Sequence, residues 1–374
     1  MTTLLVLTVL VLVAIAIWQL TKIFELSQLK SEASQSEIAN DADNKTHGYL
    51  LFGFLIFIYG INIFSFAKYS KFLLPEAASA HGGEYDTLMW VSFAVIFFVQ
   101  IITQALLHYF GYKYRGEKGK KALFYADNDR LEFIWTIIPV IVLAGLIISG
   151  LYYWTEIMDV SEDDDPLIVE LYAQQFNWTA RYGGADNVLG DASVRLIDID
   201  RANVLGLDES DPNATDDVIV KELYLPVGRK VNFYMRSQDV LHSAYMPHFR
   251  AQMNCVPGMI TQFSFTPTIT TEEMRLNPEV VDKVKRTNQL RAQWAAEGRP
   301  NSDPWVFDYV LLCNKICGKS HYNMQMKIVV VTQKEYDDWM AEQKTFNDTM
   351  LAADGEEGFT PAQSRTEIVA VNQQ

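Results

Sequence analysis

The segment CNKICGKSHYNM (residues 313–324) places two thiols, an imidazole and a thioether within twelve residues. About seventy residues upstream, the segment DVLHS (239–243) supplies a further imidazole between two stretches with strand-like patterns. Sulfur ligands combined with imidazole select copper or zinc over hard cations. The two segments therefore predict a soft-metal site that uses His242, Cys313, Cys317, His321 and Met324.

Several kinds of site compete for these residues. A disulfide between Cys313 and Cys317 suits an oxidising compartment, but it leaves His321 and Met324 unexplained. Zinc has little use for a thioether, and a mononuclear blue-copper site needs only one cysteine. Two thiolates that bridge two copper ions, with one histidine on each ion, use every soft side chain of the loop. Met324 and a main-chain carbonyl between the cysteines then take the axial positions. The residues favour this dinuclear copper site, and the disulfide and zinc remain open alternatives.

The first 155 residues contain four long apolar runs. Each is long enough to cross a hydrocarbon core of about 30 Å. The first run has no basic flank and no small-residue cleavage site, so we expect an uncleaved span and not a secretory signal. The runs are Leu4–Trp18, Tyr49–Phe66, Met89–Phe110 and Phe133–Tyr153.

The basic residues of the connecting loops predict the orientation of these spans. The loop 111–130 carries six Lys and Arg, the loop 19–48 carries three, and the loop 67–88 carries two. An excess of Lys and Arg in short loops marks the cytoplasmic side. Both termini and everything after the fourth run are then predicted to be extracytoplasmic.

Charge divides the chain into a membrane half and an acidic half. Residues 1–154 carry 11 Lys and Arg against 12 Asp and Glu, whereas residues 155–374 carry 20 against 34. The chain has no block of basic residues, which argues against binding to nucleic acid. Three cysteines in 374 residues exclude a disulfide-rich scaffold.

The acidic half is rich in short β-type segments separated by turns, which is typical of a Greek-key sandwich. Two stretches interrupt the pattern: 183–217 is rich in Gly, Asp and Asn, and 271–299 has a helical composition. The tail from Glu335 begins as an amphipathic helix and ends in a segment of disordered composition. The segments with strand patterns are LIVELYAQQFNWTARY (167–182), KELYLPVGRKVNFYMRS (221–237), GMITQFSFTPT (258–268), FDYVLLC (307–313) and QMKIVVVTQ (325–333).

The pattern C-x3-C-G-x2-H-x2-M after a distant D-V-x-H-S resembles subunit II of cytochrome c oxidase. LEFIWTIIPVIVL (131–143), which follows a basic loop, is similar to that family's second transmembrane helix. AQQFNWTARY (173–182) resembles its aromatic electron-entry segment, and PHFRAQMNCVPGMITQFSF (247–265) also follows its pattern. The resemblance covers about residues 89–182 and 220–332.

The resemblance implies a bacterial form of the family with two additional N-terminal helices. The expected fold is an α-helical membrane anchor of four transmembrane helices followed by an all-β, cupredoxin-like Greek-key sandwich. The chain would reside in the bacterial plasma membrane with its copper domain outside. The implied domains are an extra helical pair (1–70), the family's helical hairpin (86–156), a copper A domain (166–333) with insertions at 183–217 and 271–299, and a C-terminal helix with a disordered tail (334–374).

The resemblance also implies a function and a set of site residues. Two copper ions would be held by the five side chains named above and by the main-chain carbonyl of Lys315. Phe176 and Trp178 would mark electron entry, and Glu132 the entrance of a proton channel; a solvated helix-start acid is the simpler interpretation of Glu132. The chain would take electrons from cytochrome c, or from a haem domain of a neighbouring complex, and pass them to haem in subunit I, which reduces oxygen to water as protons are translocated. Subunit III is a further expected partner.

Two departures from the family pattern matter. The family usually has Glu where this chain has Lys315, and that Glu side chain helps to bind magnesium. A cation in its place makes a magnesium site doubtful. Phe176 stands where Trp is usual. The chain has no C-x-x-C-H motif, so we expect no attached c-type haem.

Three other functions compete with an oxidase subunit. A quinol oxidase subunit II shares the fold but lacks copper ligands, and this chain has all of them. A copper A subunit of a membrane nitric oxide reductase stays open. A membrane-tethered sandwich with a Cys313–Cys317 disulfide and no redox role also stays open.

Overall fold

The computed structural model describes residues 2–28, 40–159, 165–300 and 302–355. The chain forms two compact units. One consists of Met1–Ser70 with Phe93–Ile137, and the other of Lys71–Ser92 with Ile138–Gln374. The expected disordered tail lies largely outside the described residues.

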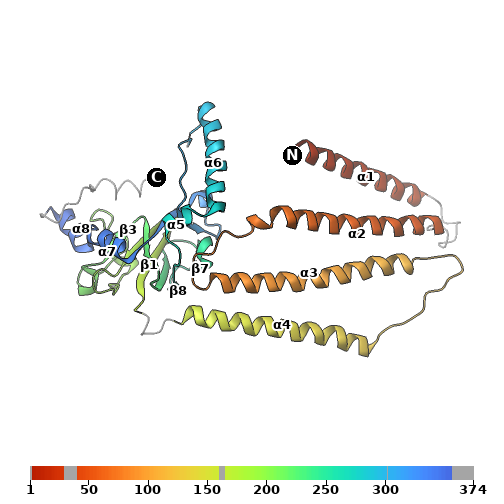
Figure 1. The fold of residues 1–374 in the computed structure, drawn as a ribbon, viewed down its shortest axis with the longest axis horizontal. Coiled ribbons are helices and arrows are strands. Elements are labelled where there is room, and N and C mark those ends of the chain that lie inside the picture. Colours follow the sequence, from red (N-terminus) through yellow and green to blue (C-terminus); the bar gives the residue numbers. More distant parts are fainter. Residues whose placement is uncertain (1, 29–39, 160–164, 301, 356–374) are drawn as a thin grey trace. The chain divides into compact units, whose positions relative to one another are not determined.

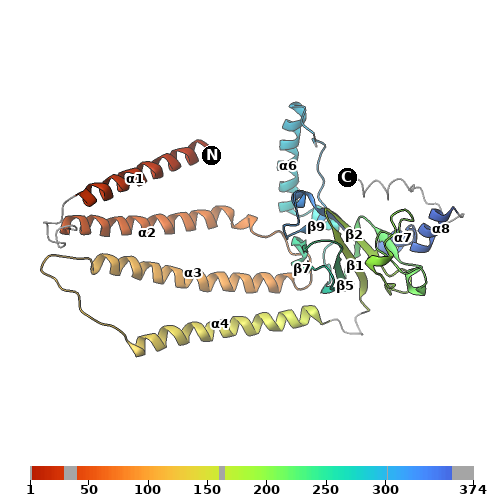
Figure 2. The ribbon, with the colours of Figure 1, turned by 180° about the vertical axis from the view of Figure 1, so that it is seen from behind.

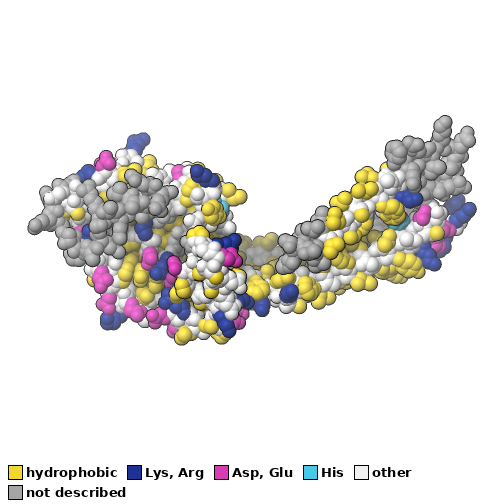
Figure 3. All heavy atoms as spheres, turned by 90° about the horizontal axis from the view of Figure 1, so that it is seen from above, with side chains coloured by type: hydrophobic (Ala, Val, Ile, Leu, Met, Phe, Trp, Pro, Cys, Tyr) yellow, Lys and Arg dark blue, Asp and Glu magenta, His cyan; other side chains and the backbone are white. Residues whose placement is uncertain are grey.

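Long helices make up the N-terminal part of the chain (Figure 1). Three segments are long and apolar enough to cross a membrane: Asp41–Phe72, Gly82–Lys113 and Asp129–Met158. A shorter apolar stretch, Leu10–Ile23, lies in the first helix. Hydrophobic side chains are exposed along these helices in Figure 3, as expected for surfaces that face lipid or other subunits. The helices are α1 (Thr2–Gln28), α2 (Asp41–Tyr69), α3 (Gly82–Lys113) and α4 (Asp129–Met158).

The second helix, α2, contacts α3. The Tyr59 hydroxyl donates a hydrogen bond to the carbonyl of Ile101. The His108 imidazole of α3 is buried, and its centroid lies 6.1 Å from that of the Phe54 ring on α2. A polar side chain inside a span is costly in lipid, so α2 covers the face of α3 that carries His108.

The remainder of the chain is a β-sandwich of two five-stranded sheets (Figure 2). One sheet has the order β3-β2-β1-β5-β8, and the other has the order β4-β10-β9-β6-β7. Each sheet combines antiparallel pairs with one parallel pair, β1 with β5 and β4 with β10. This topology confirms the expected cupredoxin-like Greek-key fold. The strands are β1 (Leu167–Gln174), β2 (Asn177–Tyr182), β3 (Val218–Val220), β4 (Leu223–Pro226), β5 (Val231–Ser237), β6 (His242–Met246), β7 (Ala251–Cys255), β8 (Thr261–Phe265), β9 (Tyr309–Cys313) and β10 (Gln325–Val331).

Alternating side chains of the strands form the core between the sheets. In β10 the residues Met326, Ile328 and Val330 are buried, and the residues between them are partly exposed. In β5 the buried Val231, Phe233 and Met235 keep the same period of two. The register of these strands positions the ends of β6, β9 and β10, which carry the metal-ligand candidates.

The two stretches expected as insertions have different structures. Residues 183–217 contain two short 3-10 helices and pack through Leu205 and Leu207 against Phe346 and Met350. Residues 271–299 are helical, as expected from their composition. The C-terminal part forms two helices where the sequence predicted one. The helices are α5 (Thr271–Arg275), α6 (Pro278–Ala296), α7 (Gln333–Ala341) and α8 (Phe346–Asp354).

A half-buried ion pair ties the sandwich to the second turn of α3. The Arg250 guanidinium donates two hydrogen bonds of 2.7 Å to the Asp86 carboxylate. The same guanidinium donates to the carbonyls of Pro75 and Pro247. Paired and hydrogen-bonded in this way, a charge tolerates burial. Arg250 thus holds the chain before α3 against the sheet that contains β7.

Candidate metal centre

The sequence motif 313–324 is the loop that joins β9 to β10. Cys313 is the last residue of β9, and its N–H donates to the carbonyl of Met324 at 3.1 Å, immediately before β10. The N–H of Asn314 donates to the carbonyl of Ser243 on β6 at 2.9 Å. These two bonds close the base of the loop and fix it beside the start of β6. Residues 71 positions apart in the chain are thereby brought together at one end of the sandwich.

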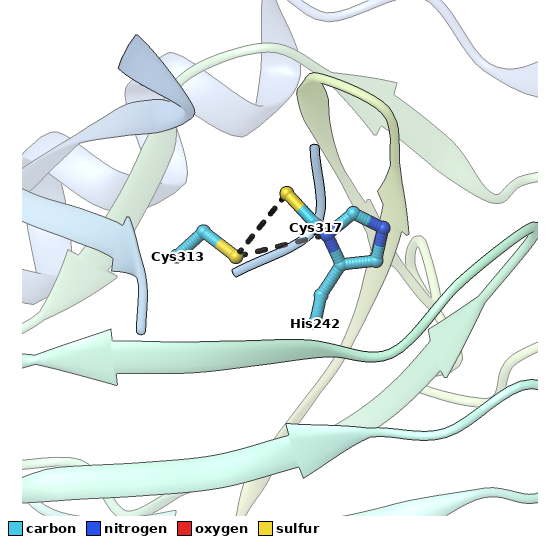
Figure 4. A group of neighbouring side chains, drawn as sticks. All are labelled: His242, Cys313 and Cys317. Carbon is cyan, nitrogen blue, oxygen red and sulfur yellow. Dashed lines mark hydrogen bonds between the residues drawn. The ribbon is translucent and has the colours of Figure 1, made fainter. Parts of the chain in front are cut away.

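The expected ligands converge at this end of the sandwich. The Cys313 sulfur lies 3.7 Å from His242 Nδ1, and the Cys317 sulfur lies 3.6 Å from His321 Nδ1. The two sulfurs are 3.9 Å apart. Figure 4 shows His242, Cys313 and Cys317 pointing toward one another. Each thiol therefore stands between the other thiol and one imidazole.

Two further donors border the thiols. The Met324 sulfur lies 3.8 Å from the Cys317 sulfur, and the Lys315 carbonyl oxygen lies 3.2 Å from the Cys313 sulfur. Met324 is buried, whereas the Lys315 side chain is exposed. Only the main chain of Lys315 therefore faces the site, and its ammonium group does not compete for the ligands.

The His242 ring is oriented by a carboxylate. His242 is fully buried at the start of β6, and its Nε2 lies 2.9 Å from Asp239 Oδ1. This partner assigns the proton to Nε2 and leaves Nδ1 as the metal-binding atom. Burial opposes ionisation of Asp239, but hydrogen bonds from His242 and from the main chain of Gln175 and Val240 outweigh it and lower the pKa of the carboxyl.

The set of donor atoms discriminates among the alternatives. A disulfide requires a sulfur–sulfur distance of about 2.05 Å, and both cysteines are free thiols here. Burial, with the adjacent Cys313 thiol, raises the pKa of Cys317 to about 11. A bound metal ion displaces the thiol protons, and its positive charge offsets the repulsion between the two adjacent thiolates. Two thiols, two imidazoles, a thioether and a carbonyl suit copper better than zinc, which is satisfied by four N/S ligands.

The third cysteine, Cys255, lies beside the site without joining it. It is opposite His242 in the β6–β7 register and is fully buried. Burial raises the pKa of its thiol to about 12. His248 is likewise buried, between the rings of Phe307 and Tyr309. Neither side chain is among the ligand candidates, and both pack within the sandwich core.

The aromatic segment 176–178 reaches the loop through Gly318. A β-carbon at Gly318 would lie 2.9 Å from two ring atoms of Phe176 and 2.9 Å from Gln175 Nε2. The backbone there has φ +144°, which disfavours any side chain. Glycine therefore lets the Phe176 ring sit directly on the loop. Phe176 is partly exposed, whereas Trp178 is 1% exposed and contacts the His242 ring.

Glu132 lies far along the chain from this site, in the first turn of α4, where its side chain is exposed. Its N–H donates to the carbonyl of Asn128 at 2.8 Å, and the Asn128 side chain caps Leu131. An acid in a helical first turn is stabilised by the macrodipole.

Sequence reasoning assigned no role to Gln175 or Gly318. The Gln175 side-chain amide donates to the carbonyl of Cys317, and its main-chain N–H donates to Asp239 Oδ2 at 2.7 Å. Gln175 thus links the carboxylate that orients His242 to the loop that carries both thiols. Gly318 has a signal, because it follows Cys317 directly in the motif. Gln175 has none, because a single Gln in a turn looks like any solvated residue.

Comparisons with known proteins agree with this architecture. Residues 67–151 match the family description Cytochrome C oxidase subunit II, transmembrane domain, and residues 167–273 match its periplasmic domain. The chain is 30% identical over 266 residues to the alternative cytochrome c oxidase subunit 2 of Bradyrhizobium diazoefficiens, covering 71% of this chain and 82% of the relative.

A second relative and a solved structure are similar to this chain at lower identity. The cytochrome c oxidase subunit 2 of Alkalihalophilus pseudofirmus is 24% identical over 262 residues, covering 68% of this chain and 57% of that protein. The periplasmic domain of subunit II of cytochrome oxidase (CoxB) of Bradyrhizobium japonicum is 18% identical with a TM-score of 0.27, covering 47% of this chain and 91% of that one. With both family domains matched and 30% identity over most of one relative, the chain belongs to the cytochrome c oxidase subunit II family and is a membrane-anchored part of an oxidoreductase complex.

Proposed function

We propose that this chain is the electron-entry subunit of an aerobic terminal oxidase and that it holds a dinuclear copper A centre. The observation that supports the proposal is the pair of thiols 3.9 Å apart, each with its own imidazole nitrogen within 3.7 Å. Both thiols would bridge two copper ions, and His242 and His321 would bind one ion each. The Met324 sulfur and the Lys315 carbonyl would be the axial donors.

Copper in such a site accepts and releases one electron at a time. The surrounding residues keep the ligand geometry constant between these states. Asp239 orients His242, Gln175 ties the loop to β1, and the bond between Cys313 and Met324 closes the loop. A buried, pre-organised ligand set needs little rearrangement when its charge changes.

Substitution of Cys317 with Ser tests the copper proposal. In the purified oxidase, the unchanged chain should bind two copper ions and show thiolate-to-copper bands with a seven-line paramagnetic spectrum. The Ser variant should retain at most one copper and lose the seven-line pattern, because one bridging thiolate is gone. Cys255→Ser is the matched control, since that thiol stands outside the ligand set. Two coppers and an intact seven-line spectrum in Cys317→Ser would reject the assignment.

The proposed electron route starts at Phe176 and passes Trp178 on the way to His242. Phe176 is the more exposed of the two rings and rests on Gly318.

The donor would be cytochrome c or a haem domain of a neighbouring complex. Residues 156–217 carry 16 acids against three Arg, so a basic donor would be steered toward this domain. Stopped-flow reduction of the copper at two salt concentrations tests this; a rate independent of salt would mean that the donor is held by packing.

The proposed assembly places the chain beside subunit I, which accepts the electrons at haem and reduces oxygen to water, and beside subunit III. We further propose four membrane spans with both termini outside, in the bacterial plasma membrane, and Glu132 as the entrance of a proton path. Magnesium is not included in the proposal, because Lys315 replaces the usual Glu and its side chain points to solvent.

A further inference from the structure

Helix α6 lies within the stretch 271–299 and has no part in the copper site. Figure 1 and Figure 2 show it projecting from one edge of the sandwich. One of its faces is fixed to the domain. Val280 is buried, Asn288 exchanges hydrogen bonds of 3.0 Å and 2.7 Å with the main chain of Trp305, and Arg291 donates to the carbonyl of Asp303. The helix is therefore held in one orientation, and its other faces are presented to whatever surrounds the domain.

Beside this face lie the residues Lys283, Arg286, Leu290 and Trp294, which we call the α6 stripe; at its edge the Lys283 ammonium lies 5.6 Å from the centroid of the Trp305 ring. Their spacing of i, i+3, i+7 and i+11 aligns them along one side of the helix. All four are exposed, Leu290 at 53% and Trp294 at 37%. Two cations followed by a large aliphatic and an indole ring are the composition of a helix that lies in a membrane interface.

The α6 stripe is adjacent to the end of an apolar membrane segment. The Arg286 guanidinium lies 5.6 Å from the centroid of the Phe72 ring. Phe72 is the last residue of the apolar segment Asp41–Phe72, and Phe72 and Leu73 are themselves exposed. A residue in contact with the end of a span lies at the depth of the lipid headgroups, where Trp and Arg are favoured.

The charge of helix α6 indicates which kind of surface the α6 stripe binds. Helix α6 carries four cations, Lys283, Lys285, Arg286 and Arg291, against two acids, whereas residues 155–374 as a whole carry 34 acids and 20 cations. Arg299 adds a cation 5.7 Å from the Trp294 ring. An anionic lipid surface attracts this basic helix, whereas it repels the domain as a whole. A protein partner selected by the rest of this domain would be basic, and the α6 stripe would repel it.

We propose that the α6 stripe is an interfacial anchor that binds the anionic headgroups of the outer leaflet. Leu290 and Trp294 enter the boundary between headgroups and acyl chains, and Lys283 and Arg286 contact lipid phosphates. The anchor restrains the copper domain at a point outside the transmembrane helices. This inference is independent of the copper proposal, since it uses no ligand of that site.

Photo-crosslinking in the assembled oxidase tests the anchor. A benzophenone amino acid replaces Leu290 in one full-length chain and Lys285, which faces away from the stripe, in another. Each complex is placed in nanodiscs of phosphatidylglycerol or phosphatidylcholine, and adducts on the α6 peptide are identified by mass spectrometry. We expect lipid adducts at 290 to exceed those at 285 by roughly tenfold, and to be more abundant in phosphatidylglycerol.

Charge reversal provides the second measurement. Arg286→Glu should lower the phosphatidylglycerol adduct at 290 by at least about fivefold, whereas Lys285→Glu, with the same change of charge on the same helix, should leave it unchanged. Equal lipid yields at 290 and 285 would overturn the proposal. Adducts at 290 with another polypeptide would also overturn it, because they would show that a subunit covers the stripe.

Discussion

The Trp178 indole presents its edge to the His242 imidazole, with ring centroids 6.2 Å apart and ring planes at 63°. Trp178 is almost fully buried, so an incoming donor protein does not touch it. The ring instead fills the space behind a proposed copper ligand. Its Nε1 has no hydrogen-bond partner within the described part of the chain, so the contribution of this side chain is packing.

This arrangement separates the roles of the two aromatic residues. Trp178→Ala should destabilise the domain by about 3–5 kcal/mol, because it leaves a large cavity, and should lower copper content. Trp178→Phe should retain copper. Phe176→Ala should leave stability and copper nearly unchanged but slow reduction by the donor. Denaturant unfolding, copper analysis and stopped-flow reduction measure the three effects; normal copper and stability in Trp178→Ala would contradict this division.

Gly318→Ala should disturb the loop, although it adds only a methyl group. The new β-carbon would lie 2.9 Å from Phe176 and Gln175, in a backbone conformation that side chains rarely adopt. We expect a loss of about 1–3 kcal/mol and a shifted thiolate-to-copper band, because the Gln175 bond to Cys317 must move. Gly258→Ala is a control for the backbone conformation alone: it has φ +80° and nothing within 4 Å of an added methyl. An unshifted band in Gly318→Ala would show that the loop absorbs the methyl elsewhere.

His248 should make stability depend on pH. Burial, followed by the charges of Lys283 and Arg250, lowers the pKa of His248 to about 4 from 6.5, against a hydrogen bond to the Glu76 carbonyl. A depressed histidine pKa means that stability is complete above about 6.5 and is lost as the pH falls toward 4. Between pH 7.5 and 5 the loss from this group should be about 2 kcal/mol.

The measurement is denaturant unfolding of the full chain at both pH values, with His248→Phe as the comparison. The variant should lose less stability on acidification, since phenylalanine does not titrate, and the other groups cancel in the difference. An identical loss in the two proteins would contradict the prediction, because it would show that the pKa of His248 is the same in the folded and the unfolded chain.

Glu132→Gln tests the proton path. Its side chain is at the start of α4, and the proposed copper ligands belong to the sandwich that follows this helix in the chain. A helix of 30 residues is about 45 Å long, so the substitution should slow turnover while copper reduction and the copper spectrum stay unchanged. Asp129→Gln, in the same first turn, is the matched control. Turnover equal to that of the unchanged enzyme would show that Glu132 is only a helix-start acid.

The sequence predicted the parts of the molecule that depend on local pattern. Strand periodicity and the C-x3-C-G-x2-H-x2-M spacing were sufficient for the sandwich and for the residues that converge on the site. The orientation of His242 by Asp239 was not predictable in detail, because it depends on how the turn before β6 folds. The link from Gln175 to Cys317 joins positions 142 apart and follows only from the packing of β1 against the loop.

Burial was the other quantity that the sequence did not reveal. Trp178 and Phe176 lie two residues apart in one aromatic segment and looked equivalent. Their exposure differs because Trp178 is the second residue of β2 and its side chain points toward the core, whereas Phe176 stands in the turn. Similarly, the tail was expected to hold one helix, but capping boxes at Thr332 and Thr345 start two.

The ion pair between Arg250 and Asp86 limits how this protein can be divided. The extracytoplasmic body is discontinuous in sequence, because its fold includes the segment before α3. Ala78 exchanges main-chain hydrogen bonds with His248 and Thr268, and Asp86 neutralises Arg250. A soluble fragment that begins at residue 166 would expose a bare guanidinium and leave strand-edge groups unpaired. Engineering a water-soluble copper protein from this chain would therefore require grafting residues 75–86 onto it or replacing Arg250 with a neutral residue.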